Sequence, residues 1–459
     1  MRDLILLFSF LAFFGMGVFN PFILGLGYVW VDIFSPQRID YSLLSGISIS
    51  YLIAIATFAA YLLLDRKNPP RFNIVFVFLA LFAGWITLTL HWAVSPGAAE
   101  VKWGWAIKVV CFTIFVPYLF RTRVQIEALL LTILFSVGGT LLSFGIKTAI
   151  SGGGYGVYLG LYSSNLGLGE GSTVALTAVS IIPLLLYFAD NSQILPRILF
   201  SRLMMYGFSA VAVLTAIGTT SRTGLVSLCV LMTLRWFGSS RKFIHLIGLI
   251  LLTGTATFFV DQSWQYRMST IKDYEMESSN AGRIAVWKWT IKFVSENPHG
   301  GGFDAYRINE IEIPHPLNPD HTIKMKGRAF HSSYFEVLGE HGFIGLAVFG
   351  CLIFLTIRFL NQSSSDPPKS EEGVWIAGLA SATRQSLLVY LVGSFFIGIA
   401  FQPFMYYLIA TAICLRELAW RGHRSVAGSD DDAAHGRLLP GQLDRWGRSS
   451  SHPPLDRQS

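Results

Sequence analysis

Long apolar runs separated by short polar connections dominate the first 418 residues of this 459-residue sequence. A run of about 20 apolar residues can cross the hydrocarbon core of a bilayer as a helix, and slightly shorter runs suffice when flanking side chains snorkel. Eleven such runs lie at roughly 43–64, 73–92, 104–120, 124–144, 173–188, 203–218, 224–237, 243–260, 342–360, 386–400 and 403–418. The pattern predicts an all-α integral membrane protein.

The N-terminal region, residues 4–34, adds one or two further crossings. Asn20-Pro21 interrupts its apolar pattern, and proline breaks a helix interior because it lacks an N–H group and its ring collides with the preceding turn. The region therefore forms either one crossing with a half-helix or two short crossings, and we favour one. The total is then about 12 transmembrane helices. No convincing small-residue cleavage site follows the first apolar run, so we expect no cleavable signal peptide.

Basic residues gather in every second connection between the apolar runs, and such loops are cytoplasmic as a rule. Working back from a cytoplasmic C-terminus, these basic loops are 361–385, 238–242, 189–202, 121–123 and 65–72. The loops that then lie outside are 93–103, 145–172, 219–223, 261–341 and a tip near residue 401. The net charge of +7 is explained by this distribution and calls for no nucleic acid partner.

Residues 1–420 form one polytopic domain in this interpretation, and residues 421–459 form a tail of different composition. The tail is rich in Ser, Gly, Asp, Pro and Arg, and it cannot bury enough apolar surface to fold alone. We expect it to be disordered and cytoplasmic. The four cysteines lie far apart inside apolar runs, without metal-ligand spacing, and indicate neither a disulfide framework nor a metal site.

The outer loop 261–341 is about 80 residues long, and loops of that size are usually functional or disordered. Asn280 can cap a helix that begins at Ala281 and ends at Asn297-Pro298. Its apolar residues recur at helical spacing at Ile284, Trp287, Ile291 and Val294. We expect an amphipathic helix that can lie along the membrane surface, with Arg283 on the same face as Trp287.

Three polar residues are candidates for chemistry because of their positions: Arg222, Arg283 and His331. Arg222 lies at a membrane boundary on the side that avoids basic residues, which suggests a functional site, although an arginine that snorkels to the interface explains it about equally well. Arg283 can be a solvated helix charge. His331 can be an inert loop histidine, as His299, His315, His321 and His341 illustrate. Downstream, Gly342 and Gly345 allow close helix packing.

Residues 219–224, 280–303 and 328–345 together resemble the O-antigen ligase and polymerase superfamily. The shared pattern is an Arg before a span, a second Arg in a large periplasmic loop, and a His near the end of that loop followed by Gly-x-x-Gly. The start Met1-Arg2-Asp3-Leu4 and the stretch from Tyr28 to Arg38 look more specifically like the O-glycosylation ligases associated with exosortase systems. The resemblance covers most of residues 1–418.

The resemblance implies transfer of a glycan from a polyprenyl-diphosphate carrier to an acceptor hydroxyl at the periplasmic face of the cell inner membrane. It assigns Arg222 and Arg283 to the diphosphate and His331 to the acceptor. Arginine forks neutralise a leaving diphosphate well, and histidine has a pKa near working pH. Glu336 or Glu340 can orient His331, and Trp287 and Ser332 are possible supporting residues. The implied enzyme is a metal-independent glycosyltransferase without cofactors, and direct displacement makes it inverting.

Several functions remain open from sequence. A ligase that transfers a preassembled chain to a protein or a lipid, and a polymerase that joins repeat units of an exopolysaccharide, use the same parts. A flippase for lipid-linked glycans is a different class, but it requires charged residues along several spans, whereas the charges here lie near span ends. No Gly-rich phosphate loop followed by Lys-Ser/Thr supports an ATP-driven mechanism. We therefore favour the transferase.

Overall fold

The computed structural model describes the chain except for Met1, Val18, residues 40–42, Ser45, Arg66 and the ranges 152–169, 239–275, 316–317 and 437–459. At a few helix and strand ends only the backbone is described. The expected span 243–260, the beginning of the outer loop and the glycine-rich stretch after Ser151 lie outside the described residues.

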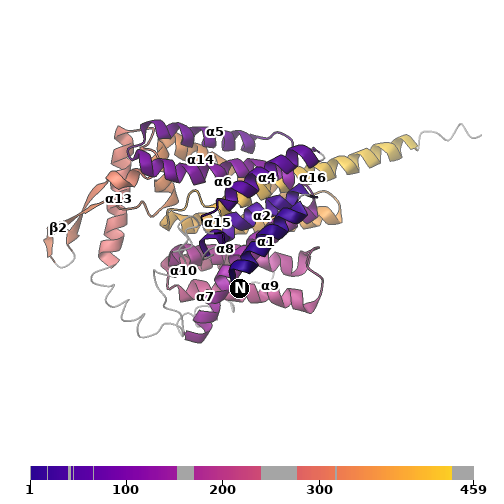
Figure 1. The fold of residues 1–459 in the computed structure, drawn as a ribbon, viewed down its shortest axis with the longest axis horizontal. Coiled ribbons are helices and arrows are strands. Elements are labelled where there is room, and N and C mark those ends of the chain that lie inside the picture. Colours follow the sequence, from indigo (N-terminus) through magenta and orange to yellow (C-terminus); the bar gives the residue numbers. More distant parts are fainter. Residues whose placement is uncertain are drawn as a thin grey trace, which may run out of the picture.

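Most of the described chain is a bundle of helices that run along the long axis of the molecule (Figure 1). The α-helices are α1 (Arg2–Gly17), α2 (Pro21–Phe34), α3 (Pro36–Ile39), α4 (Ile49–Leu64), α5 (Ile74–Leu88), α6 (Pro96–Leu119), α7 (Arg123–Ser151), α8 (Gly171–Asn191), α9 (Leu199–Gly218), α10 (Arg222–Gly238), α13 (Met276–Glu296), α14 (Ser333–Ser365), α15 (Glu371–Gly393) and α16 (Pro403–Gly436). Short 3-10 helices are η1 (Thr89–Trp92), η3 (Ala305–Ile308) and η4 (Ser394–Phe396).

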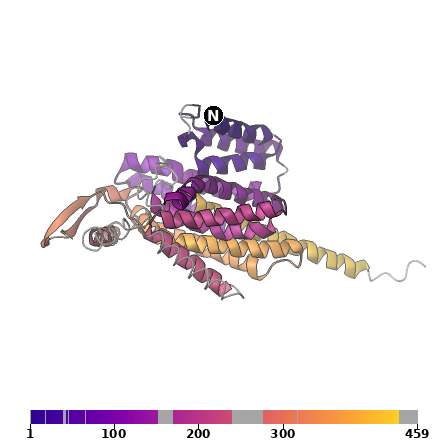
Figure 2. The ribbon, with the colours of Figure 1, turned by 90° about the horizontal axis from the view of Figure 1, so that it is seen from below.

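One small sheet accompanies the described helices. Strands β1 (Glu310–His315) and β2 (Asn318–Lys326) pair antiparallel, with Ile311 opposite Met325. The hairpin projects beyond one end of the bundle, and α16 extends beyond the other end (Figure 2). The two ends of the molecule are therefore easily told apart.

Five of the described helical segments are long and apolar enough to cross a membrane: Ile74–Trp92, Arg123–Ile150, Gly171–Asn191, Leu199–Gly218 and Ser333–Ser365. Shorter apolar helices cover Asp3–Gly17, Pro21–Phe34 and Ile49–Leu64. The all-α membrane class is thus supported, and the total of about 12 crossings stays a prediction. In several of these helices many large apolar side chains are exposed, as a lipid-facing surface requires.

The N-terminal region is two helices, where we favoured one crossing. The break falls at Asn20-Pro21, with Pro21 at the first position of α2. Phe13 contacts Trp30 at 5.6 Å between ring centroids, and a Cβ added at Gly17 would lie 2.2 Å from Leu24 Cγ. These contacts fold α1 back along α2 as an antiparallel hairpin.

Helix boundaries near the C-terminus also differ from the prediction. Helix α15 occupies residues that we assigned to a basic loop at 361–385, because Ser370 caps it by accepting a bond from the Gly373 N–H group. The chain then leaves helical geometry within the expected span 386–400. Helix α16 continues to Gly436, so the beginning of the tail is helical where we expected disorder. An anchored helix has already met the cost of nucleation and can propagate into a weakly apolar segment.

The segments predicted to lie outside the cytoplasm meet at the end of the bundle that carries the hairpin. The Val94 N–H group donates to the Gly301 carbonyl at 2.8 Å, and the Ser221 hydroxyl donates to the Ser172 hydroxyl at 3.2 Å. At the opposite end, Arg71 pairs with Glu417. The structure thus groups the predicted outer loops with one another, and which side of the membrane each end faces stays a prediction.

Candidate active site

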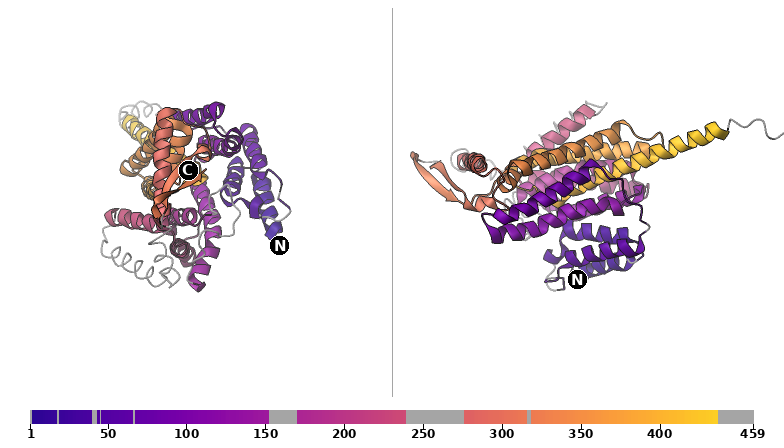
Figure 3. Two further views of the ribbon diagram at one scale, coloured as in Figure 1. Left: turned by 90° about the vertical axis from the view of Figure 1, so that its left-hand side faces the viewer. Right: turned by 90° about the horizontal axis from the view of Figure 1, so that it is seen from above.

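Helix α13 lies across the end of the bundle, nearly perpendicular to the other helices, and is seen end-on in the right panel of Figure 3. It begins at Met276, one turn before the predicted start, so Asn280 lies inside it. Ile284 and Ile291 are 50% and 52% exposed, whereas Val286 and Val294 are buried. The predicted apolar stripe is therefore wrong in part, because the helix packs through its 282–286–290–294 face.

Trp287 fixes α13 to the segment that carries His331. Its indole N–H group donates to the Phe330 carbonyl at 2.9 Å, and its ring stacks on Phe335 at 4.8 Å. Phe330 directly precedes His331, so Trp287 acts on the backbone beside the candidate histidine. This geometry fits the supporting position that we assigned to Trp287.

The three consecutive glycines after His299 form a backbone pairing with α14. The Gly301 N–H group donates to the Gly339 carbonyl at 3.0 Å, and the Gly302 N–H group donates to the Glu340 carbonyl at 2.8 Å. These carbonyls are available because α14 kinks at Gly342, whose φ is +67°. The glycines thereby attach the outer loop to the start of the span.

A side chain at Gly342 would meet the Pro298 carbonyl oxygen at 2.1 Å, and one at Gly300 would meet the Gly342 backbone nitrogen at 2.5 Å. Both positions have positive φ, which glycine adopts without steric cost. We predicted that Gly342 serves close packing between helices, but it serves close packing between a loop and a kinked helix.

His331 lies on the short connection between β2 and α14, where it lines a cavity. Its φ is +48°, and Thr220 and Asp304, also at this end, have φ of +51° and +57°. Non-glycine residues in this conformation are strained and are held there only by their surroundings. Next to it, Ser332 is the N-cap residue of α14, and its carbonyl accepts the Glu336 N–H group at 2.8 Å. The concentration of strain supports a functional site at this end.

Arg283 lies within electrostatic range of both Arg222 and His331. Arg222 is the first residue of α10 and is exposed, and Arg283 is half-buried on α13. Burial lowers the pKa of Arg283, the charge of Arg222 lowers it further, and the charge of Glu170 opposes this. Burial also lowers the pKa of His331, and the charges of Arg283 and Arg328 add to that effect. Arg283 is therefore coupled electrostatically to Arg222 and also to His331.

A buried lysine that the sequence reasoning missed forms a second cluster. The Lys102 ammonium donates to Glu336 and Glu340 at 2.6 Å each and lies 3.6 Å from an Asp304 carboxylate oxygen. The suggestion that Glu336 or Glu340 orients His331 has no support in this geometry, because these carboxylates contact Lys102, backbone N–H groups and, for Glu340, His341. The signal was available: Lys102 is a lysine in a loop predicted to lie outside, where short basic loops are avoided.

His341 is also more than a loop residue. Its side chain is fully buried, and its Nδ1 atom lies 3.0 Å from the Thr89 hydroxyl. Its Nε2 atom lies 3.8 Å from the second carboxylate oxygen of Glu340. These contacts connect η1 to the first turns of α14, so His341 serves the packing beneath the cavity.

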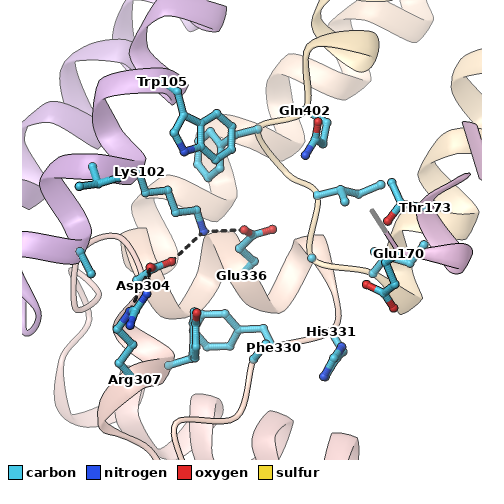
Figure 4. A pocket seen from close by; sticks show the side chains of 18 residues that line it. Lys102, Trp105, Glu170, Thr173, Asp304, Arg307, Phe330, His331, Glu336 and Gln402 are labelled. Atoms are coloured by element: carbon cyan, nitrogen blue, oxygen red, sulfur yellow. Dashed lines mark hydrogen bonds and ion pairs between the residues drawn. The ribbon is translucent and has the colours of Figure 1, made fainter. Parts of the chain in front are cut away.

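The cavity at this end has a volume of about 550 Å³ and lies between α6, the start of α14 and the segment before α16 (Figure 4). Its lining consists of Ala98, Val101, Lys102, Trp105, Glu170, Thr173, Asp304, Tyr306, Arg307, Ala329, Phe330, His331, Glu336, Ile397, Gly398, Ile399, Phe401 and Gln402. His331 and Glu170 lie at the right of this view, and Lys102 and Asp304 lie at the left. Within the described residues, no group of three or more His, Cys, Asp or Glu side chains is placed to hold a metal ion.

Two family models match separate parts of the chain. Residues 1–193 match a family of unknown function (DUF5935), and residues 207–350 match the family described as O-antigen ligase. The second match supports the O-antigen ligase superfamily. It contains Arg222, Arg283 and His331, whereas Lys102 and Glu170 fall in the first match. A search of curated proteins found no significant match. The link to exosortase systems stays a prediction.

Proposed function

We propose that the protein is a glycosyltransferase of the membrane surface that moves a preassembled glycan from a polyprenyl diphosphate to an acceptor hydroxyl. The O-antigen ligase match supports a function of the ligase or polymerase type. The observation that carries the residue assignment is that Arg283 lies close enough to both Arg222 and His331 to act on them electrostatically, while His331 lines a cavity. The proposed location is the periplasmic face of the inner membrane, with a cytoplasmic C-terminus.

Arg222 and Arg283 suit the donor diphosphate. Burial is the main cause of the lowered pKa of Arg283, and the charge of Arg222 adds to it, so an anion bound beside the two guanidinium groups would stabilise both charges. Guanidinium groups bind phosphate oxygens through charge-assisted, often bidentate bonds. They would therefore stabilise the negative charge that develops on the leaving diphosphate.

His331 suits the acceptor hydroxyl. Its lowered pKa keeps the imidazole neutral near pH 7, so that one ring nitrogen can accept a proton. In the proposed step the acceptor oxygen forms a bond to the anomeric carbon while the bond from that carbon to the diphosphate oxygen breaks. The diphosphate leaves with the electron pair, and His331 takes the hydroxyl proton. A single displacement inverts the anomeric centre and needs no metal.

The test is transfer by the purified full-length protein from a lipid-linked glycan to candidate protein, lipid and glycan acceptors. We expect His331→Ala to lower the transfer rate by about 10²- to 10⁴-fold, as loss of a general base does. His423→Ala, at the opposite end of the bundle, is the matched control. If His331→Ala transfers glycan at the wild-type rate, His331 is not the general base. If glycan crosses the membrane of reconstituted vesicles without being transferred to an acceptor, the result favours the flippase. A product of retained configuration excludes single displacement.

A further inference from the structure

The cavity beside His331 is unsuited to a diphosphate, although two cations line it. Lys102 is held by Glu336 at 2.6 Å, and Arg307 is held by Asp304 at 3.1 Å. Glu170 adds a further carboxylate to the lining. An anion that entered would find both lining cations already paired and would face the carboxylates of Asp304, Glu336 and Glu170 at short range.

The remaining lining suits a sugar. Trp105, Tyr306 and Phe401 contribute aromatic surface, and Gln402 contributes an amide. The C–H face of a sugar ring packs on aromatic rings, and its hydroxyls bond to carboxylates and amides. Ligand sites commonly combine an apolar, aromatic lining with a few placed polar groups, and this cavity of about 550 Å³ falls within their usual size.

We propose that this cavity is the acceptor subsite, that it takes an uncharged sugar, and that it discriminates against acidic sugars. The proposal rests on the proposed function and adds that the donor and the acceptor bind on opposite sides of His331. The donor diphosphate binds on the side of Arg222 and Arg283, and the acceptor sugar binds on the side of Asp304 and Glu336. His331 lines the cavity, and the charge of Arg283 lowers its pKa. Its position between the two sides of the site therefore allows it to contact both substrates.

A substitution that fills the cavity separates the two substrates. Ala98→Phe places a large ring in the lining, and the matched control is Gly97→Phe, where an added Cβ meets no atom within 4 Å. Two probes are used on the full-length protein: farnesyl diphosphate, and a mixed pool of neutral and uronic-acid oligosaccharides read by affinity mass spectrometry. Thermal unfolding confirms that each variant is folded, and Gly398→Phe, also in the lining, replaces Ala98→Phe if that variant is not.

We expect the wild-type protein and Gly97→Phe to retain neutral sugars. Ala98→Phe should retain at least ten-fold less neutral sugar than wild type. It should still bind farnesyl diphosphate with an affinity within two-fold of wild type. The proposal is overturned if the wild-type protein retains no sugar, retains uronic acids equally well, or retains only hydroxyl-bearing peptides offered in parallel. It is also overturned if Ala98→Phe weakens farnesyl diphosphate binding as much as Arg283→Ala does. Failure of the proposed function looks different, because then Arg222→Ala and Arg283→Ala bind farnesyl diphosphate like wild type.

The charge selectivity has its own test. Asp304→Asn removes one negative charge, and asparagine tolerates the positive φ at this position. We expect its ratio of uronic-acid to neutral-sugar retention to rise at least three-fold. Glu312→Gln removes the same charge from the exposed hairpin, outside the cavity lining, and should leave the ratio unchanged. An unchanged ratio in Asp304→Asn overturns the proposed selectivity.

Discussion

Two cationic clusters lie at the same end of this protein and differ in how their charge is balanced. Lys102 is surrounded by three carboxylates at 2.6 to 3.6 Å. Among the described residues no carboxylate lies within ion-pair distance of Arg222 or Arg283, and Glu170 acts on Arg283 only from farther away. The cation of the first cluster has carboxylate partners at ion-pair distance, and the cations of the second cluster have none.

The difference indicates separate roles. A buried cation that is fully paired holds elements together, and here it joins α6, the turn at Asp304 and the first turns of α14. Two neighbouring arginines without a carboxylate partner lower the stability of the fold, and such a site can bind an anionic ligand. Stability experiments should therefore single out Lys102, and activity experiments should single out the arginines.

The largest effect on stability is expected for Lys102→Met. This change leaves Glu336 and Glu340 buried without their counter-ion, and breaking a buried pair from one side costs about 3–5 kcal/mol. Chemical unfolding in detergent measures it. The double variant Lys102→Met with Glu340→Gln should recover part of the loss, and a loss below about 1 kcal/mol in the single variant would show that the cluster is not structural.

Arg283→Ala should have the opposite profile. Removing one preorganised group that stabilises developing charge lowers the turnover number by about 10²- to 10³-fold. The fold should change little in stability, because the variant no longer buries a charge and loses both the attraction to Glu170 and the repulsion from Arg222. Transfer rate and unfolding are measured on the same preparation, with Arg202→Ala as the control. If Arg283→Ala lowers the unfolding free energy as much as Lys102→Met does, the proposed difference in role between Arg283 and Lys102 is wrong.

A change of intermediate size concerns pH. The charge of Arg328 lowers the pKa of His331, so Arg328→Ala raises that pKa toward its ordinary value. Protonated His331 cannot accept a proton, and the acid limb of the activity profile should therefore move to higher pH. Lys324→Ala, which removes the same charge from the hairpin, should leave the limb in place. A shift toward lower pH contradicts His331 as the base.

The smallest effect is expected for the exposed pair of Arg202 and Asp190, which are 54% and 44% exposed. Exposed ion pairs contribute about 0–1 kcal/mol, so Arg202→Ala should change the unfolding free energy by no more than that. Chemical unfolding is again the measurement, and an effect as large as that of Lys102→Met would mean that burial does not distinguish the two pairs.

Parts of the site were predictable because they leave a local signal. Arg222 breaks the distribution of basic loops, and the helix with Arg283 has helical apolar spacing and ends near Asn297-Pro298. The buried face of that helix was not predictable, because Ile284 and Val286 are equally apolar and only the packing partner decides which one turns inward.

The sequence by itself determined the membrane class, the alternation of the loops and the candidate arginines and histidine, since hydropathy, charge bias and short motifs act within local stretches of chain. Only the tertiary structure decided that the predicted outer loops share one end, that Gly301 and Gly302 pair with a kinked helix, and that Glu336 and Glu340 contact Lys102. Lys102, for example, lies more than 200 positions from Glu336 and Glu340 in the sequence. No local pattern specifies which carboxylate a distant ammonium will meet, because that choice depends on how the helices pack.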